Sequence, residues 1–139
     1  MRQWYIKMKN KFKKSWKSSK QPRKQRKYLA KAPLGIRKKF VSANLAKDLR
    51  KKYNKRNLPL RKGDTVRIMR GKFSSKKGKI TKVMLKFSKV IVDGIQIKKK
   101  DGSKIDVKME PSNLQILELN MDDKRRIKNK EKAEVKENK

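Results

Sequence analysis

A cluster of cations surrounds the turn from Gly71 to Gly78, and no other stretch of the sequence has residue types and spacing better suited to chemistry. The turn is rich in Gly, Ser and Lys, and its cations are Arg70, Lys72, Lys76, Lys77 and Lys79. Glycines let a backbone approach a ligand closely, and main-chain amides and cationic side chains bind phosphate oxygens. The pattern predicts phosphate binding, although glycines that only turn the chain and lysines that only keep it soluble would look the same.

The sequence contains no arrangement of residues that is suited to catalysis. The chain contains no His and no Cys, which excludes thiol and imidazole catalysis, the usual zinc ligands and disulfide bonds. Asp122 and Asp123 are adjacent, but neighbouring helical residues point about 100° apart and do not form one acid–base or metal site. The turn from Gly71 to Gly78 lacks the Gly-Lys-Ser/Thr ending of a nucleotide-binding P-loop. We therefore predict no enzymatic activity, cofactor, metal or small-molecule substrate.

The charge balance indicates a polyanionic partner. The 139 residues include 46 Lys and Arg against 12 Asp and Glu, for a net charge of +34. Such a charge opposes compaction unless RNA, DNA or an anionic membrane neutralises it. Residues 1–47 contain no acid, and an acid-free arm beside a small core is typical of proteins that bind folded nucleic acid. No apolar run approaches the ~20 residues of a membrane-spanning helix and no signal-peptide core is visible, so we expect no membrane insertion.

Short strands are predicted to hold the basic turn in place. From Asp64 to Arg70 apolar and polar residues alternate, which points Val66 and Ile68 inward and Arg67 outward. A second run carries Val83, Leu85 and Phe87 on one side, and a third, Val90–Val92, stops at Asp93-Gly94. Further strands are expected through Ile95 and Ile97, back from the Asp101-Gly102 hairpin along Ile105, Val107 and Met109, and, after a turn at Pro111–Asn113, through Leu114–Leu117. The path predicts a mainly β fold, a small, strongly bent antiparallel barrel filled by its own side chains.

Helices are expected on either side of this barrel. Arg23–Ala32 should form a short basic helix that Pro33 ends, and Ala43–Tyr53 an amphipathic helix with Leu45, Leu49 and Tyr53 on one face. Asn120 is expected to cap a short C-terminal helix that begins with Asp122 and Asp123, while Lys128–Lys139 should be frayed. The predicted organisation is an arm (1–20), a basic helical extension (21–57), the barrel (58–119) and a C-terminal helix with its tail (120–139).

The arm allows three interpretations. Aromatic and apolar residues recur there every fourth position, at Trp4, Met8, Phe12 and Trp16. They could stack on exposed RNA bases, form an amphipathic helix on a membrane, or belong to a solvated segment that is disordered in the isolated protein.

Two spaced segments resemble a KOW motif: Gly63-Asp64-x-Val66-x-Ile68-x-x-Gly71, then Lys77-Gly78-Lys79-Ile80-x-x-Val83. Transcription elongation factors also carry this motif, so the flanking segments matter. The chain is similar to the archaeal and eukaryotic branch of universal large-subunit ribosomal protein twenty-four (twenty-six in eukaryotic numbering) over Gln21–Arg126. The segments that carry this similarity are Gln21–Lys27, Ala32–Leu34, Arg61–Thr65, Val92–Ile95, Lys99–Gly102, Pro111–Asn113 and Leu119–Arg126. Gly35 and Glu110 depart from it, because relatives usually carry His there.

The resemblance implies an SH3-like KOW barrel in a structural protein of the large ribosomal subunit. Expected partners are large-subunit rRNA and neighbouring ribosomal proteins, with the protein a monomer in the cytoplasmic ribosome, acting early in assembly and near the nascent-chain exit. Together with the charge pattern it predicts RNA contacts through basic residues, turn glycines and two polar residues. They are Arg23, Lys24, Arg26, Lys27, Arg37, Lys38, Lys39, Arg61, Lys62, Arg67, Arg70, Gly71, Lys72, Lys76, Lys77, Gly78, Lys79, Lys98, Lys99, Ser112, Asn113, Arg125 and Arg126.

Two other functions remain open at this level. One is a transcription elongation or antitermination factor, although such proteins usually join KOW domains to an α/β domain, and no βαβ pattern precedes Leu60. The other is a small basic nucleic-acid-binding or membrane-surface protein that uses its arm. Co-sedimentation with ribosomes, RNA polymerase or chromatin would distinguish these functions.

Overall fold

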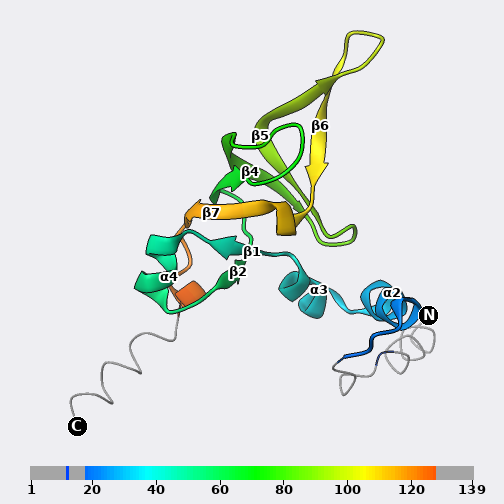
Figure 1. Cartoon of the computed structure of the whole chain (residues 1–139), viewed down its shortest axis with the longest axis vertical. Helices are drawn as coiled ribbons and strands as arrows, with labels where there is room; N and C mark the ends of the chain where they lie inside the picture. Colours follow the sequence, from blue (N-terminus) through cyan, green and yellow to red (C-terminus); the bar gives the residue numbers. More distant parts are fainter. Residues whose placement is uncertain (1–11, 13–17, 128–139) are drawn as a thin grey trace.

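A single seven-stranded sheet forms the centre of the protein, whose structure, a computed structural model, describes residues 12 and 18–127. Its strands follow the order β2-β1-β7-β3-β4-β5-β6. Their bounds are β1 Ser42–Leu45, β2 Asn57–Pro59, β3 Thr65–Ile68, β4 Lys77–Met84, β5 Lys89–Lys98, β6 Lys104–Met109 and β7 Leu114–Glu118. The helices are α2 Pro22–Lys31, α3 Leu34–Phe40 and α4 Lys47–Tyr53, with short 3₁₀ turns η1 Pro111–Asn113 and η2 Lys124–Ile127. Figure 1 shows α2 and α3 on one side of the sheet's lower end and α4 on the other.

The sheet is bent in the way that a small SH3-like barrel requires. Register shifts interrupt the β3–β7, β4–β5 and β5–β6 ladders, and such bulges bend a strand and increase its twist. The shift in β5 lies between Ile91 and Gln96, where Gly94 adopts a φ of +73°. The predicted stop at Asp93-Gly94 is therefore a bulge within one long strand. All paired strands are antiparallel except β1 and β7, which run parallel.

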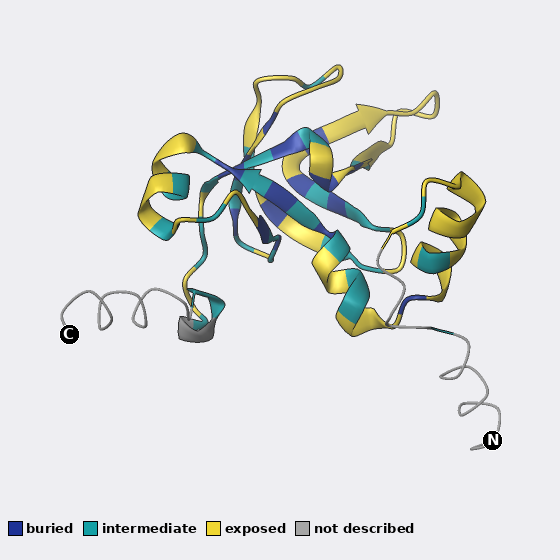
Figure 2. Cartoon of the chain, turned by 60° about the horizontal axis from the view of Figure 1, so that its bottom comes forward, coloured by how far each residue is buried: buried dark blue, intermediate teal, exposed yellow. Residues whose placement is uncertain are grey.

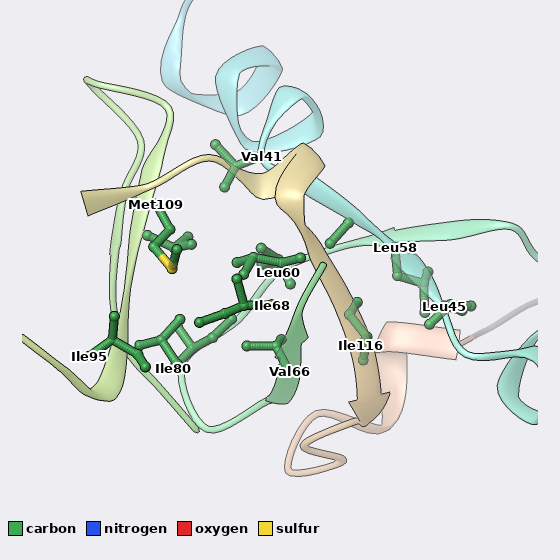
Figure 3. Close-up of a cluster of buried hydrophobic side chains, with 14 residues drawn as sticks. Val41, Leu45, Leu58, Leu60, Val66, Ile68, Ile80, Ile95, Met109 and Ile116 are labelled. Carbon is green, nitrogen blue, oxygen red and sulfur yellow. The ribbon is translucent and has the colours of Figure 1, made fainter. Parts of the chain in front are cut away.

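The core lies inside this bent sheet and draws on both halves of the chain (Figures 2 and 3). Val66, Ile68 and Ile116 have no exposed surface, and Ile80 is 1% exposed. Alternation along β3, with Arg67 exposed between Val66 and Ile68, confirms the predicted period-two pattern. The remaining buried apolar members are Val41, Ala43, Leu45, Leu58, Leu60, Val90, Val92, Ile95, Met109 and Leu114.

The segment predicted as the helix Ala43–Tyr53 divides into a strand and a helix. Ala43 and Leu45 are buried while Ser42 and Asn44 are half-buried, so β1 follows period two up to Leu45. Helix α4 then begins at Lys47, and Leu49 still packs against the core. The prediction was wrong because β1 finds hydrogen-bonding partners in both β2 and β7, and such tertiary pairing overrides local helical spacing. The core therefore extends beyond the predicted barrel, residues 58–119, and includes Val41, Ala43 and Leu45.

Three smaller differences concern where elements begin and end. Strand β4 stops at Met84, and Leu85 and Phe87 lie in the turn to β5, with Phe87 62% exposed. Helix α3, which was not predicted, begins directly after Pro33. The C-terminal element is the 3₁₀ turn η2 from Lys124, rather than an α-helix capped by Asn120. The arm residues other than Phe12 and 18–20, and the tail from Lys128, lie outside the described residues.

Candidate nucleic-acid interface

The basic turn between β3 and β4 is an ordered loop fastened at both ends. The Ser75 N–H donates to the Ile68 carbonyl (2.8 Å), and the Ser74 N–H donates to the Gly71 carbonyl (2.9 Å). Gly71 and Ser75 adopt φ angles of +91° and +68°, which tighten the turn. Phe73 packs from the loop onto the core. The main chain of the loop is thus fixed, and its cationic side chains project from a rigid base.

The outer face of β3 and β4 places cations directly opposite one another. Arg67 pairs in register with Lys77, and Thr65 pairs with Lys79. Like charges opposite each other across an antiparallel ladder are destabilising, so an anion over Arg67 and Lys77 would stabilise the pair. Arg67, Lys77 and Lys79 are exposed and continue into the exposed cations of the loop. We call the whole set the basic strip: Arg67, Arg70, Lys72, Lys76, Lys77 and Lys79.

The predicted polar residues Ser112 and Asn113 lie beside this strip. They belong to η1, and the Asn113 carbonyl accepts a hydrogen bond from the Met69 N–H at 2.8 Å. Ser112 is exposed and Asn113 half-buried. The structure therefore brings the β3–β4 loop and η1, which are distant in sequence, into one surface with the basic strip.

Packing against a neighbouring strand requires glycine at position 78, which the sequence alone did not show. A Cβ at this position would lie 2.7 Å from the Asp93 carbonyl oxygen and 2.8 Å from Val92 Cγ1. Gly78 is thus required because strand β5 passes close to it, and it is not among the glycines with positive φ. The position of its missing side chain faces protein, so the geometry does not support Gly78 as a point of close RNA approach.

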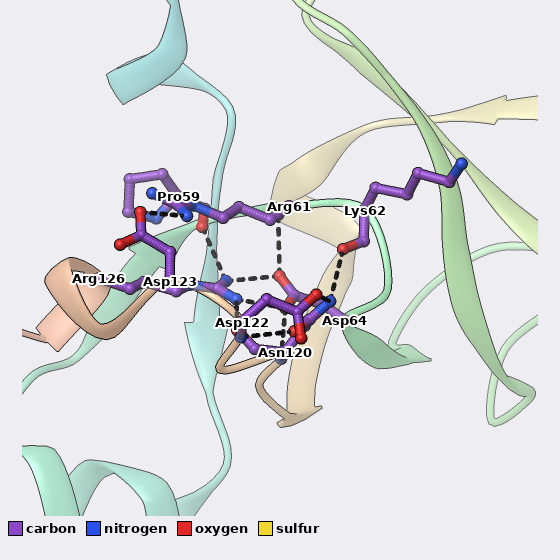
Figure 4. A network of polar contacts seen from close by, with 8 residues as sticks. All are labelled: Pro59, Arg61, Lys62, Asp64, Asn120, Asp122, Asp123 and Arg126. Atoms are coloured by element: carbon purple, nitrogen blue, oxygen red, sulfur yellow. Dashed lines mark hydrogen bonds and ion pairs between the residues drawn. The ribbon is translucent and has the colours of Figure 1, made fainter.

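Arg126 is buried inside a polar network and is not free for a phosphate (Figure 4). Its side chain is 4% exposed, and its Nη1 and Nη2 each lie 2.6 Å from a carboxylate oxygen of Asp64, which has no exposed surface. Arg126 also donates to the carbonyls of Asn120 (2.8 Å) and Pro59 (3.2 Å). The structure does not favour the predicted RNA contact at Arg126, because its side chain is buried and the chain's own carboxylate and carbonyls occupy both Nη groups. Its Nε is also buried, without a hydrogen-bond partner in the described part of the chain.

Two further predicted arginines also make contacts within the protein. Arg61 lies 2.8 Å from Asp123, and both side chains are partly exposed. Arg37 donates from Nε to the Ala32 carbonyl (2.8 Å), from Nη1 to the Lys86 carbonyl (3.1 Å) and from Nη2 to the Ala30 carbonyl. Arg37 thereby fastens the α2–α3 connection to the β4–β5 turn, which suggests a positioning role for it.

The remaining predicted residues are spread over other parts of the surface. Exposed cations lie on α2, on α3, before β3 and at the end of β5, namely Arg23, Lys24, Arg26, Lys27, Lys38, Lys39, Lys62, Lys98 and Lys99. The side chain of Arg125 lies outside the described residues. The structure thus joins the basic strip to Ser112 and Asn113, while α2 lies apart from the barrel beyond α3 (Figure 1).

Glu110, one of the two departures from the expected family pattern, has a partner. Its Oε1 lies 2.5 Å from Lys89 Nζ, and this hydrogen bond and charge hold the pKa of Glu110 below its usual value. Gly35, the other departure, lies on α3 in open space, because a Cβ there would meet nothing within 4 Å. Neither departure disturbs the fold around it.

Sequence reasoning missed the Asp64 carboxylate as the centre of the polar network. The sequence contained one indication that Asp64 has a structural role. It is one of only 12 acids, and it directly precedes a strand with one apolar face. Its partner Arg126 lies 62 residues away, so no local pattern could have connected the two. Among the described residues no acidic cluster suits a metal ion, and no helix there is long and apolar enough to cross a bilayer.

Comparison with known proteins decides the family. A family model that describes the eukaryotic ribosomal proteins L26 and their archaeal L24-type counterparts matches residues 19–132. The chain belongs to this family of ribosomal proteins. A family member from Methanosphaera stadtmanae, named large ribosomal subunit protein uL24, is 49% identical over 108 residues, which cover 78% of this chain and 92% of that protein. The resemblance in the sequence to a large-subunit ribosomal protein is therefore confirmed.

Membership also decides between the alternatives left open by the sequence. It favours a structural ribosomal constituent over an elongation factor or a membrane-surface protein, and the family is not known as one of enzymes. The matched region includes all of the sheet as well as α2 and α3.

Proposed function

We propose that this ribosomal protein binds large-subunit rRNA through the basic strip, as a monomer within the cytoplasmic ribosome. The observation that carries the proposal is the register of Arg67 opposite Lys77, with Lys79 on the same outer face. Because this arrangement is unfavourable without an anion, and because the loop beside it is held rigidly, the strip suits a phosphate backbone.

Recognition would rest on shape more than on base sequence. Lys and Arg contact phosphates and set the orientation of a protein on a nucleic acid, whereas base edges carry the sequence information. A-form RNA hides its major-groove edges in a deep, narrow groove. The rigid strip would therefore follow the phosphates, while the polar Ser112 and Asn113 beside it could reach 2′-hydroxyls. The exposed cations of α2 and α3 would extend this contact to a second rRNA segment.

The wider role follows from the family. Neighbouring large-subunit proteins are the expected protein partners, and early assembly near the nascent-chain exit is the expected setting. A protein with a charge of +34 would compact rRNA segments by neutralising their phosphates, which suits an early step of assembly.

A triple substitution of the strip tests this proposal. We expect Arg67→Ala/Lys77→Ala/Lys79→Ala to weaken binding to a large-subunit rRNA fragment. The slope of log affinity against log salt should fall by about 2–3, roughly one for each phosphate that is no longer neutralised. Stability should stay equal or rise slightly, since a repulsive pair is removed. Thermal melting and binding at several salt concentrations measure both effects.

The matched control removes the same charge elsewhere. Lys47→Ala/Lys51→Ala/Lys52→Ala strips three exposed lysines from α4, which no predicted contact includes. If both triple variants lose affinity and slope equally, binding depends on total charge, and the strip is not the interface.

A further inference from the structure

The β5–β6 hairpin extends beyond the barrel and has two chemically different faces (Figure 1). In its ladder Ile97 pairs with Ile105, while Gln96 pairs with Asp106 and Lys98 with Lys104. Because side chains alternate between faces along a strand, one face is apolar and the other is polar. Gln96 Nε2 donates to Asp106 Oδ1 at 2.9 Å on the polar face.

The apolar face is a continuation of the core that nothing in the described part of the chain covers. Along β6, Met109 is buried, Val107 is half-buried and Ile105 is 43% exposed. On β5, Ile95 is 2% exposed and Ile97 is 50% exposed. Ile97, Ile105 and Val107 line a shallow groove together with Lys99 and Lys108. The hairpin thus exposes an aliphatic surface to water outside the barrel. This exposure is unfavourable in free energy compared with burial of the same surface.

The charges around this groove define the partner that suits it. From Gln96 to Lys108 the hairpin is rich in lysine and has two aspartates, and Asp101 is already engaged by the side chain and N–H of Ser103. We propose that the apolar face is a docking site for a protein segment whose apolar side chains are flanked by carboxylates. Aliphatic groups would enter the groove between Ile97 and Ile105, and carboxylates would meet the lysines at its rim.

Other occupants fit this face less well. RNA bases stack on aromatic rings or Arg guanidinium planes, and the groove contains only aliphatic side chains and lysines besides Asp106. A second copy of this chain would bring two proteins of +34 together, which repulsion opposes. The area is small, so we expect weak docking that gains strength when other contacts hold the two proteins together. This site is separate from the basic strip and does not depend on it.

Methyl signals of isoleucine report directly on the groove. The full chain, with ¹³C-labelled Ile methyl groups, is titrated with a capped peptide of alternating Leu and Glu. We expect shifts at Ile97 and Ile105, and little change at the buried Ile68. An alternating Ser and Glu peptide should leave the Ile97 and Ile105 methyls unshifted, because it has the charge without the apolar groups, and a Leu and Lys peptide should not bind.

Variants separate docking from general charge attraction. Ile97→Thr/Ile105→Thr keeps β-branched residues in the hairpin and should weaken binding of the Leu and Glu peptide at least tenfold, whereas Gln96→Thr on the opposite face should leave its affinity unchanged. The proposal is overturned if the Leu and Glu peptide shifts neither methyl, or if the double variant binds it equally well. It is also overturned if oligouridine or phosphatidylglycerol vesicles shift these methyls more than the peptide does.

Discussion

Asp64 is a fully buried carboxylate, and four hydrogen-bond donors make its burial possible. Two are main-chain N–H groups, from Arg61 at 2.8 Å and Asn120 at 3.0 Å, and two are the Nη atoms of Arg126, each at 2.6 Å. A buried charge is tolerated when it is both paired and hydrogen-bonded. This network joins the start of β3 to the segment that follows β7, near the end of the described chain.

Removing Arg126 should therefore destabilise the protein strongly. Arg126→Ala leaves the Asp64 charge buried with only its two main-chain donors, and loss of one partner of a buried pair costs about 3–5 kcal/mol. Arg67→Ala, which removes an exposed Arg from the basic strip, should change the free energy of unfolding by less than about 0.5 kcal/mol. Denaturant unfolding of both variants measures the difference, and equal stability would contradict the role assigned to the network.

Gly78 should tolerate no side chain. Its Cβ position lies 2.7 Å from a backbone oxygen of Asp93, and backbone cannot move aside as a flexible side chain can. We expect Gly78→Val to lower the free energy of unfolding by about 1–3 kcal/mol, the range for overpacking. Lys77→Ala, at the neighbouring exposed position, should keep wild-type stability. A Gly78→Val melting temperature equal to that of the wild type would show that β5 does not pass as closely as described.

At the scale of elements, β1 decides where the folded unit begins. It lies between β2 and β7 in the sheet, and Val41, Ala43 and Leu45 beside or within it are each at most 2% exposed. The barrel predicted from the sequence begins at residue 58, which leaves the segment before Lys47 outside the core. Its last residues are in fact part of that core, because an apolar strand added in parallel to β7 covers the end of the barrel.

Two truncations test this boundary. Removal of residues 1–20 should leave a protein that unfolds cooperatively, because the sheet and its core remain. Removal of residues 1–47 should abolish cooperative unfolding, because it takes β1 and three core side chains and leaves the edges of β2 and β7 without a partner. Circular dichroism during thermal melting distinguishes the two. A cooperative transition in the shorter protein would mean that β1 is dispensable.

At the scale of the whole molecule, the net positive charge determines which kind of partner can neutralise the protein. The basic strip, the α2 and α3 cations and the hairpin lysines lie on different parts of the surface, so no single small anion neutralises them. Ion pairs such as Arg61–Asp123, Lys89–Glu110 and Arg126–Asp64 relieve little of this charge, because acids are scarce in the chain. A large folded polyanion is the partner that can contact all of these regions together.

Binding to rRNA should consequently be steeply dependent on salt. If about ten phosphates are contacted, affinity for a large-subunit rRNA fragment should fall by roughly three to five decades between about 50 and 200 mM salt, because each neutralised phosphate releases condensed counterions. A salt titration of the wild-type affinity measures this slope. A nearly flat plot would rule out phosphate contacts as the main source of binding.

The sequence by itself determined the features that depend on local pattern and on composition. Alternation along β3 predicted which side chains of Thr65–Ile68 are buried, Asp101-Gly102 predicted the hairpin, and the charge balance predicted an anionic partner. The KOW spacing and its flanking segments were sufficient for the family. Each of these depends on residues close together in the chain or on totals over it, so no knowledge of the packing was needed.

Only the tertiary structure decided the features that depend on which distant segments meet. Leu45 satisfies both helical and strand spacing, and pairing of β1 with β2 and β7 selected the strand. Gly78 is required because β5 passes close to it. Arg126, which the sequence predicted as a surface cation, is instead the buried partner of Asp64. A local pattern limits the structures and contacts that a residue can adopt. The free energies of burial and pairing, which depend on neighbours far along the chain, select among them.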